Sequence, residues 1–206
     1  RRRMMLSELD RFSEGLFFCL YDTPDRLQHM FWRFREPDHP ANRKGLDPKM
    51  TGAIENHYRD LDSIVGKAMK HIDDQTLFIV LSDHGMNSFQ RGLNLNTWLH
   101  QNGFLGLQKG YQPGDDPQDE FFKHVDWDRT QAYALGLGGI FINRKGREAN
   151  GVVAPDEVEQ VKSSIIQGLT GLVDPERGET AVRAVLPREQ IYRGAYVEEA
   201  PDLLVN

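Results

Sequence analysis

The sequence has a single cysteine and no long hydrophobic run, and both absences limit what the protein can be. With Cys19 as the one cysteine in 206 residues, no intramolecular disulfide can form. This favours a reducing compartment such as the cytoplasm, although a secreted protein without disulfides would have the same composition. Cys19 lies in the apolar run 16–21 and is expected to be a buried, unreactive thiol. No run of about 18 apolar residues is present, so no membrane-spanning segment is predicted.

An excess of basic residues is also missing. The chain carries 25 lysines and arginines against 31 acidic residues, which gives a formal net charge of −6. Such a balance offers no broad basic surface, so nucleic acid is not an expected partner. The apolar share of 39% and the charged share of 27% are typical of a globular domain.

What the sequence does contain is a short apolar run that stops at residues able to bind a metal. Residues 77–81 are continuously apolar, which predicts a strand covered on both faces. Asp83 and His84 follow at once, and Gly85 can adopt backbone angles that allow a sharp turn. In open α/β sheets, ligands bind beyond the carboxyl ends of the strands. Asp83 and His84 are therefore expected at a binding edge.

A second apolar run has the same design. Residues 16–21 are apolar and aromatic and predict another buried strand, followed by a helix over residues 26–34. Asp25 and His29 are four residues apart, so on a helical turn they share one face and can reach the same ion.

A long helix over about residues 50–72 is predicted to connect these two strands. The three elements would form a right-handed βαβ unit with parallel strands. Further elements follow from periodicity and turn signals, in chain order: a helix over 4–12, a helix over 95–101, strands over 131–135 and 139–143, a helix over 155–169, a strand over 182–186 and the start of a strand near 201. Residues 35–47 and 108–119 are expected to be loops. The predicted class is α/β, with a mostly parallel sheet flanked by helices.

Four residues carry the chemical hypothesis: Asp25, His29, Asp83 and His84. Carboxylate oxygens and imidazole nitrogens suit Zn²⁺ and Mn²⁺. Simpler interpretations exist, because acid–histidine pairs at this spacing occur by chance on helix surfaces, and Asp83 can be a turn residue beside a hydrogen-bonded core histidine. Two such sets at the ends of predicted neighbouring strands nevertheless favour a metal site.

Other polar side chains favour structural roles. The hydroxyls of Thr23, Ser82 and Ser88 suit capping and turns better than nucleophilic attack. The remaining histidines have no acid at a ligand spacing and are expected on the surface: His39, His57, His71, His100 and His124.

Three segments together resemble a known family. These are Ser-Asp-His-Gly-Met at 82–86, Asp-Arg-Leu-Gln-His at 25–29 and Ala-Pro-Asp-Leu at 200–203. They resemble the type I phosphodiesterase and nucleotide pyrophosphatase branch of the alkaline phosphatase superfamily, over most of the chain. The resemblance implies a doubly wound α/β fold and hydrolysis of phosphoester bonds with two divalent metal ions, usually zinc, with manganese as an alternative.

By that resemblance, Asp25 and His29 would ligate one metal, while Asp83 and His84 would ligate the other. The family uses a threonine or serine nucleophile and a covalent intermediate, with two metals stabilising an in-line displacement. It also requires an aspartate and the nucleophile near the first strand, and a late histidine. None of these three can be placed here, and they are expected before Arg1 and after Asn206. Residues 1–206 are thus expected to be the central part of a single alkaline-phosphatase-like catalytic domain, inactive by themselves.

Three functions stay open from the sequence. The first is a metal-dependent phosphodiesterase or pyrophosphatase acting on a small phosphoester, such as a nucleotide. The second is a phosphatase, phosphomutase or sulfatase of the same superfamily, which the nucleophile segment would distinguish. The third is a catalytically inactive binding module, against which the presence of all four ligand types argues.

Overall fold

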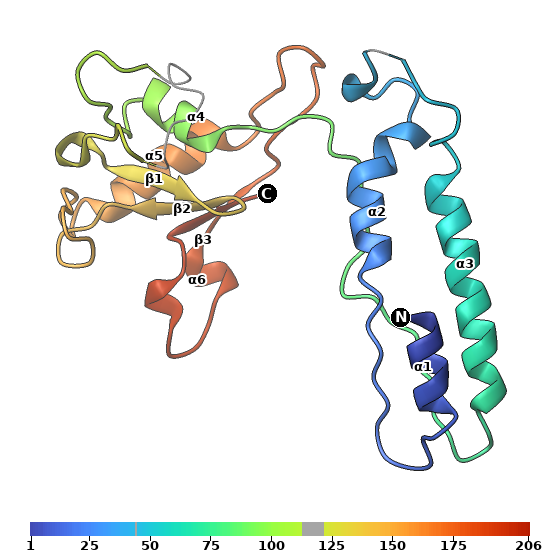
Figure 1. The fold of residues 1–206 in the computed structure, drawn as a ribbon. Coiled ribbons are helices and arrows are strands. Elements are labelled where there is room, and N and C mark those ends of the chain that lie inside the picture. The colour runs from blue at the N-terminus through green and yellow to red at the C-terminus, as the bar shows by residue number, and fades with distance from the viewer. Residues whose placement is uncertain (44, 113–121) are drawn as a thin grey trace. The chain divides into compact units, whose positions relative to one another are not determined.

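The computed structural model describes residues 1–43, 45–112 and 122–206, which divide into two compact units (Figure 1). The first unit is Arg1–Gly92 and the second is Leu93–Asn206. The predicted loop 108–119 lies partly outside the described residues. None of the helices in the described ranges combines the length and hydrophobicity that a membrane crossing requires.

The first unit is helical. Its elements are α1 (Arg2–Leu9), α2 (Thr23–Phe31), a 3₁₀ turn (Trp32–Arg35), a 3₁₀ turn (Pro40–Asn42), α3 (Ala53–Ala68) and a 3₁₀ turn (Met69–His71). Both α1 and α2 pack along α3, which buries Ile54 and Ala68 from its apolar stripe. Pro24 lies in the first turn of α2, where a missing N–H costs no hydrogen bond. The three predicted helices of this unit are confirmed, with ends shifted by a few residues.

The two predicted strands of this unit are wrong. Residues 16–21 and 77–81 form no strand, and Leu16 and Leu77 are 90% and 83% exposed. Cys19, expected to be buried, is exposed. The physical reason is that an apolar run becomes a buried strand only when a neighbour supplies backbone partners and other layers cover its faces. Among the described residues no strand pairs with either run, so the predicted βαβ unit is not formed.

The second unit combines helices with a sheet. Its elements are α4 (Leu95–Gln101), a 3₁₀ turn (Trp127–Arg129), β1 (Ala132–Leu135), β2 (Gly139–Ile142), α5 (Val158–Leu169), β3 (Val185–Pro187), α6 (Arg188–Ile191), a 3₁₀ turn (Val197–Glu199) and β4 (Leu203–Val205). All elements predicted for this part of the chain are present, and α4 has the predicted bounds.

The sheet has the order β1-β2-β4-β3, and every neighbouring pair is antiparallel. The mixed α/β class is confirmed, whereas the expected mostly parallel sheet is not what the described residues form. A tight turn over 136–138 connects β1 to β2, and so short a connection can only join antiparallel strands. Gly138 in this turn has φ +88°, and a Cβ there would lie 2.8 Å from the Val205 carbonyl oxygen.

One edge of the sheet is occupied by a side chain. The Asn96 amide on α4 donates to the Ala134 carbonyl at 3.0 Å and accepts from the Ala134 N–H at 2.7 Å. Both backbone groups that β1 would offer to a further strand at this position are thereby satisfied.

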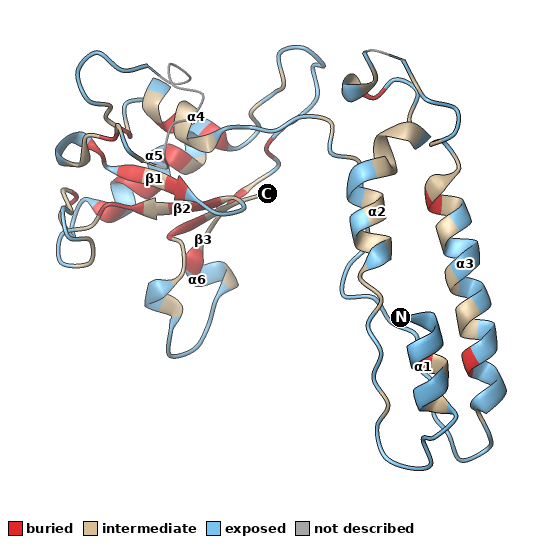
Figure 2. Cartoon of the chain, viewed as in Figure 1, coloured by how far each residue is buried: buried red, intermediate tan, exposed pale blue. Residues whose placement is uncertain are grey.

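The hydrophobic core lies in this second unit, where Figure 2 shows most of the buried residues. Helix α5 contributes Val158, Val161, Ile165 and Leu169, spaced by three and four residues along one face. They pack in one cluster with buried strand residues such as Ile140.

We predict that two isoleucine substitutions will have opposite outcomes. Ile140 is 0% exposed, so Ile140→Ser should lower the free energy of unfolding by about 3 kcal/mol. Ile79 is 62% exposed in a run without strand partners, so Ile79→Ser should change it by less than about 0.5 kcal/mol. Urea denaturation of both variants would measure this. A large loss for Ile79→Ser would show that the run 77–81 is buried.

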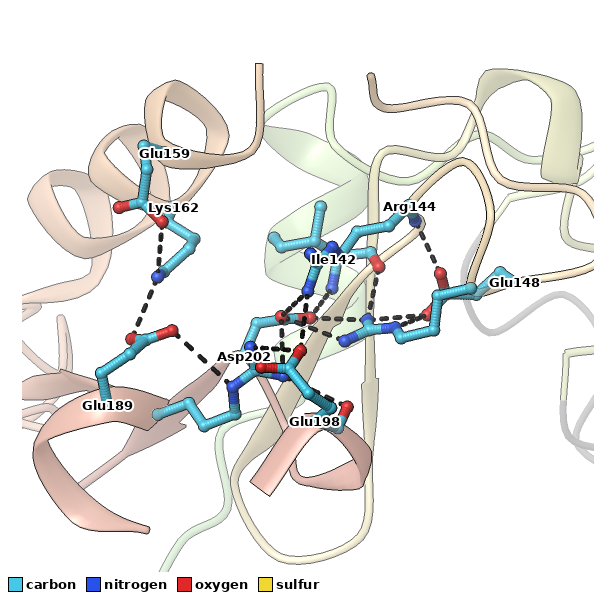
Figure 3. Close-up of polar contacts among 10 residues, drawn as sticks. Ile142, Arg144, Glu148, Glu159, Lys162, Glu189, Glu198 and Asp202 are labelled. Atoms are coloured by element: carbon cyan, nitrogen blue, oxygen red, sulfur yellow. Dashed lines mark hydrogen bonds and ion pairs between the residues drawn. The ribbon is translucent and has the colours of Figure 1, made fainter. Parts of the chain in front are cut away.

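A buried carboxylate ties the sheet to the turn that follows β2 (Figure 3). Asp202 is 2% exposed and accepts hydrogen bonds from the Ile142 N–H at 2.7 Å and from both terminal nitrogens of Arg147, at 3.1 and 2.6 Å. Arg147 also donates to the Ile142 carbonyl at 2.7 Å. Burial alone would lower the pKa of Arg147, but its hydrogen bonds to Asp202 and Glu148 raise it. Asp202 therefore has a structural role, because it connects β2 to the turn that follows it.

A buried lysine makes a second polar link in this unit. The Lys162 ammonium donates to Glu159 at 2.8 Å and to Glu189 at 3.2 Å, which connects α5 to α6 (Figure 3). Lys162 is 4% exposed, so these two carboxylates compensate a charge that burial would otherwise penalise.

We expect Asp202→Asn to destabilise the second unit by about 3 kcal/mol or more. The substitution keeps the shape of the side chain but removes the buried negative charge that faces the guanidinium of Arg147 and, at 3.6 and 3.7 Å, those of Arg144 and Arg188. Asp156→Asn, at an exposed position, is the matched control and should stay close to the parent protein. Equal unfolding midpoints for both variants in urea would contradict the structural role of Asp202.

Candidate metal centre

Helix α2 carries the first pair of candidate ligands. Asp25 lies in its first turn and His29 in its last, four residues apart as the sequence predicts. The residue before the helix, Asp22, makes no capping hydrogen bond and instead forms ion pairs with Arg26, at 2.8 Å, and with Arg1. Asp25 is the acidic residue in the first turn of the helix, where the helix dipole stabilises a negative charge.

The irregular segment after residue 81 carries the second pair. The Ser82 hydroxyl donates to the His84 carbonyl at 2.6 Å, and His84 Nδ1 lies 2.8 Å from the Gly85 carbonyl. Since a carbonyl oxygen only accepts, Nδ1 carries the proton, which leaves Nε2 of the neutral ring as the electron-pair donor. This hydrogen bond and the nearby Asp83 carboxylate raise the pKa of His84. Gly85 does not have a positive φ, so the expected use of its conformational freedom is not seen.

The structure brings all four candidate residues together, within one unit. Asp25 Oδ1 lies 3.3 Å from His29 Nε2 and 3.8 Å from His84 Nε2. His84 Nε2 in turn lies 3.6 Å from Asp83 Oδ2. The helix pair and the segment pair therefore meet, and His84 is the residue that connects them.

The spacing within each pair matches that of two ligands on one metal. Ligand atoms placed tetrahedrally about 2.1 Å from a metal are separated from each other by about 3.4 Å, close to the 3.3 Å and 3.6 Å within the two pairs. Asp25 Oδ1 is a buried carboxylate oxygen with no hydrogen-bond partner, although two imidazole nitrogens face it. Such an oxygen is costly to bury unless a positive charge compensates it.

The four candidate residues do not form a complete metal-coordination shell. Within residues 1–43, 45–112 and 122–206, no three His, Cys, Asp or Glu side chains meet the geometry of a metal site. The Asp83 side chain is 87% exposed, against 45% for Asp25. A cation would thus have to draw the exposed segment at 82–85 toward α2.

Three of the histidines expected on the surface make specific polar contacts; His39 is buried, whereas His71 is exposed as predicted. His39 is 9% exposed, lies 3.0 Å from the Phe89 carbonyl through Nε2, and accepts from the Ala41 N–H through Nδ1. His57 on α3 lies 3.0 Å from the Thr23 hydroxyl, and His71 pairs with Asp10 at 3.6 Å. The contacts with Phe89, Thr23 and Asp10 join segments far apart in sequence, so no local spacing could have indicated them.

Sequence reasoning also missed an anchor beside the candidate site. Glu36 accepts hydrogen bonds from the Ser88 hydroxyl at 2.5 Å and the Gln90 amide at 3.1 Å. The bond from Ser88 is the main cause of the lowered pKa of Glu36. Glu36 thereby fixes the chain a few residues after His84, which limits where the segment carrying Asp83 and His84 can lie.

Comparison with protein families gives one finding. The model of the type I phosphodiesterase / nucleotide pyrophosphatase family matches residues 3–205. The chain belongs to this family. Its members are phosphoester hydrolases that generally use divalent metals. A search of curated proteins and a search of solved structures each returned no match.

Zinc titration tests the cluster directly. We expect residues 1–206 to bind Zn²⁺ and Asp25→Asn to weaken binding at least tenfold, because even the loss of an outer partner of a metal ligand costs about 10-fold to 100-fold. Asp62→Asn, an exposed acid on α3, is the matched control. Isothermal titration calorimetry gives both affinities. Equal affinities for the two variants would exclude Asp25 as a ligand.

Proposed function

We propose that this chain is part of a metal-dependent hydrolase that cleaves phosphodiester or pyrophosphate bonds in nucleotides or related small molecules. Family membership supports a phosphoester substrate. The observation that carries the proposal is the convergence of two carboxylates and two imidazoles on one place, with the buried Asp25 Oδ1 facing both imidazoles.

In this proposal, Asp25 and His29 hold one cation while Asp83 and His84 hold a second. Zinc suits the mixed oxygen and nitrogen donors, and manganese is the alternative. Such cations, when bound, supply positive charge for the phosphoryl oxygens and lower the pKa of an attacking hydroxyl. The protein's own contribution is to present His84 Nε2 toward Asp25, because Nδ1 is held by the Gly85 carbonyl.

We further propose a covalent mechanism whose threonine or serine nucleophile lies outside residues 1–206. Two hydroxyls near the cluster already have structural partners, since Ser82 donates to the His84 carbonyl and Ser88 donates to Glu36. Thr23 lies beside His57 Nε2, and an imidazole in that position could act as a base. Thr23→Val therefore belongs in the test, with turnover expected to be unchanged.

The decisive assay is hydrolysis of bis(p-nitrophenyl) phosphate by the natural protein that contains this chain. Asp83→Asn should lower kcat at least 100-fold, which is an increase of about 2.7 kcal/mol in the activation free energy. Chelation should abolish turnover and added Zn²⁺ should restore it, while Asp62→Asn stays within about twofold. Residues 1–206 by themselves should show no turnover.

Each other outcome has a definite meaning. Turnover that survives chelation would refute the metal-dependent proposal. Faster cleavage of p-nitrophenyl phosphate or p-nitrophenyl sulfate than of the diester would assign a phosphatase or a sulfatase. Loss of activity in Thr23→Val would place the nucleophile inside this chain.

A further inference from the structure

The second unit contains a cavity that the proposed hydrolase site does not use. Its volume is about 440 Å³, within the range of about 300–1,000 Å³ usual for small-molecule sites. It lies between the end of α4, the segment that follows it and the 3₁₀ turn near residue 129. The side chains that matter for recognition are His100, Lys109, Tyr111 and Arg129.

The charged side chains of this cavity wall are basic. Lys109 and Arg129 both line it, and no aspartate or glutamate of the described residues does. Arg129 is held in place because its Nε donates to Asp126 at 2.6 Å and its Nη2 donates to the Leu107 carbonyl at 2.5 Å. Lys109 forms no ion pair within the described part of the chain, so its charge remains available to an anion.

An aromatic ring forms another part of the wall. Tyr111 stacks on His124 with ring centroids 3.6 Å apart, and it is still 39% exposed. His100 Nδ1 lies 2.9 Å from the Leu105 carbonyl, which fixes the imidazole in the wall. A ring supported from one side can stack with a planar ligand on the other.

We infer that this cavity binds an organic anion that carries a planar ring, of the class of a nucleoside monophosphate. The basic side chains would bind the phosphate and Tyr111 would contact the ring. The residues that line this cavity belong to Leu93–Asn206, whereas those of the proposed metal centre belong to Arg1–Gly92, and the inference does not depend on the proposed function.

The test is calorimetric titration of adenosine 5′-monophosphate into residues 1–206 in the presence of EDTA, so that no metal contributes. Saturable binding is expected, and Lys109→Ala should weaken it about tenfold, as for loss of one charge-assisted hydrogen bond. The matched control is Lys145→Ala, an exposed lysine of the same unit outside the cavity, which should bind like the parent. Both variants should show unchanged thermal unfolding.

Tyr111→Ala separates the two parts of the ligand. It should weaken binding of adenosine monophosphate but leave the weaker binding of inorganic phosphate unchanged. Absence of saturable binding at millimolar nucleotide, or equal loss in Lys109→Ala and Lys145→Ala, would overturn the inference. Loss in Asp25→Asn but not in Lys109→Ala would place the nucleotide at the metal centre, overturning the cavity assignment while leaving the proposed function intact.

Discussion

The second unit depends on one buried carboxylate, Asp202. A charge with 2% exposure is unfavourable unless several donors reach it, and here the donors are the Ile142 N–H and the Arg147 guanidinium. Those donors come from β2 and from the turn after it, while Asp202 immediately precedes β4. The same contacts that satisfy the charge therefore fix how the central strands meet, and the hydrophobic core packs around that arrangement.

The candidate metal centre, unlike Asp202, is exposed to solvent. Its candidate ligands have side chains that are 45% to 87% exposed, and two of them come from an irregular segment rather than from a strand end. Without a cation, the attraction among Asp25, His29 and His84 is screened by water, so the cluster has little stability of its own. Metal binding and ordering of the segment at 82–85 are then expected to be coupled.

Particular residues show what the sequence could and could not predict. The bounds of α4 and the hairpin β1–β2 follow from local signals, namely the Asn102-Gly103 pair that ends the helix and the glycines of the turn. Asp25 and His29 lie four residues apart on one helix, as their spacing predicts, and Asp25 lies 3.8 Å from His84; their role as metal ligands stays a prediction. The strand predictions for residues 16–21 and 77–81 were wrong because an apolar run forms a buried strand only if neighbouring strands pair with it. Asp202 could not be recognised as structural, because its partners are 55 to 60 residues away in sequence.

The side chain of Asn96 has a consequence for association between copies of the protein. An open sheet edge is a template on which another chain can add a strand, the first step of edge-to-edge aggregation. Because the Asn96 amide bonds both the carbonyl and the N–H of Ala134, it blocks the addition of a further strand to β1 at this position. Any such aggregation would have to begin at the opposite edge, on β3, whose last residue, Pro187, has no N–H to offer.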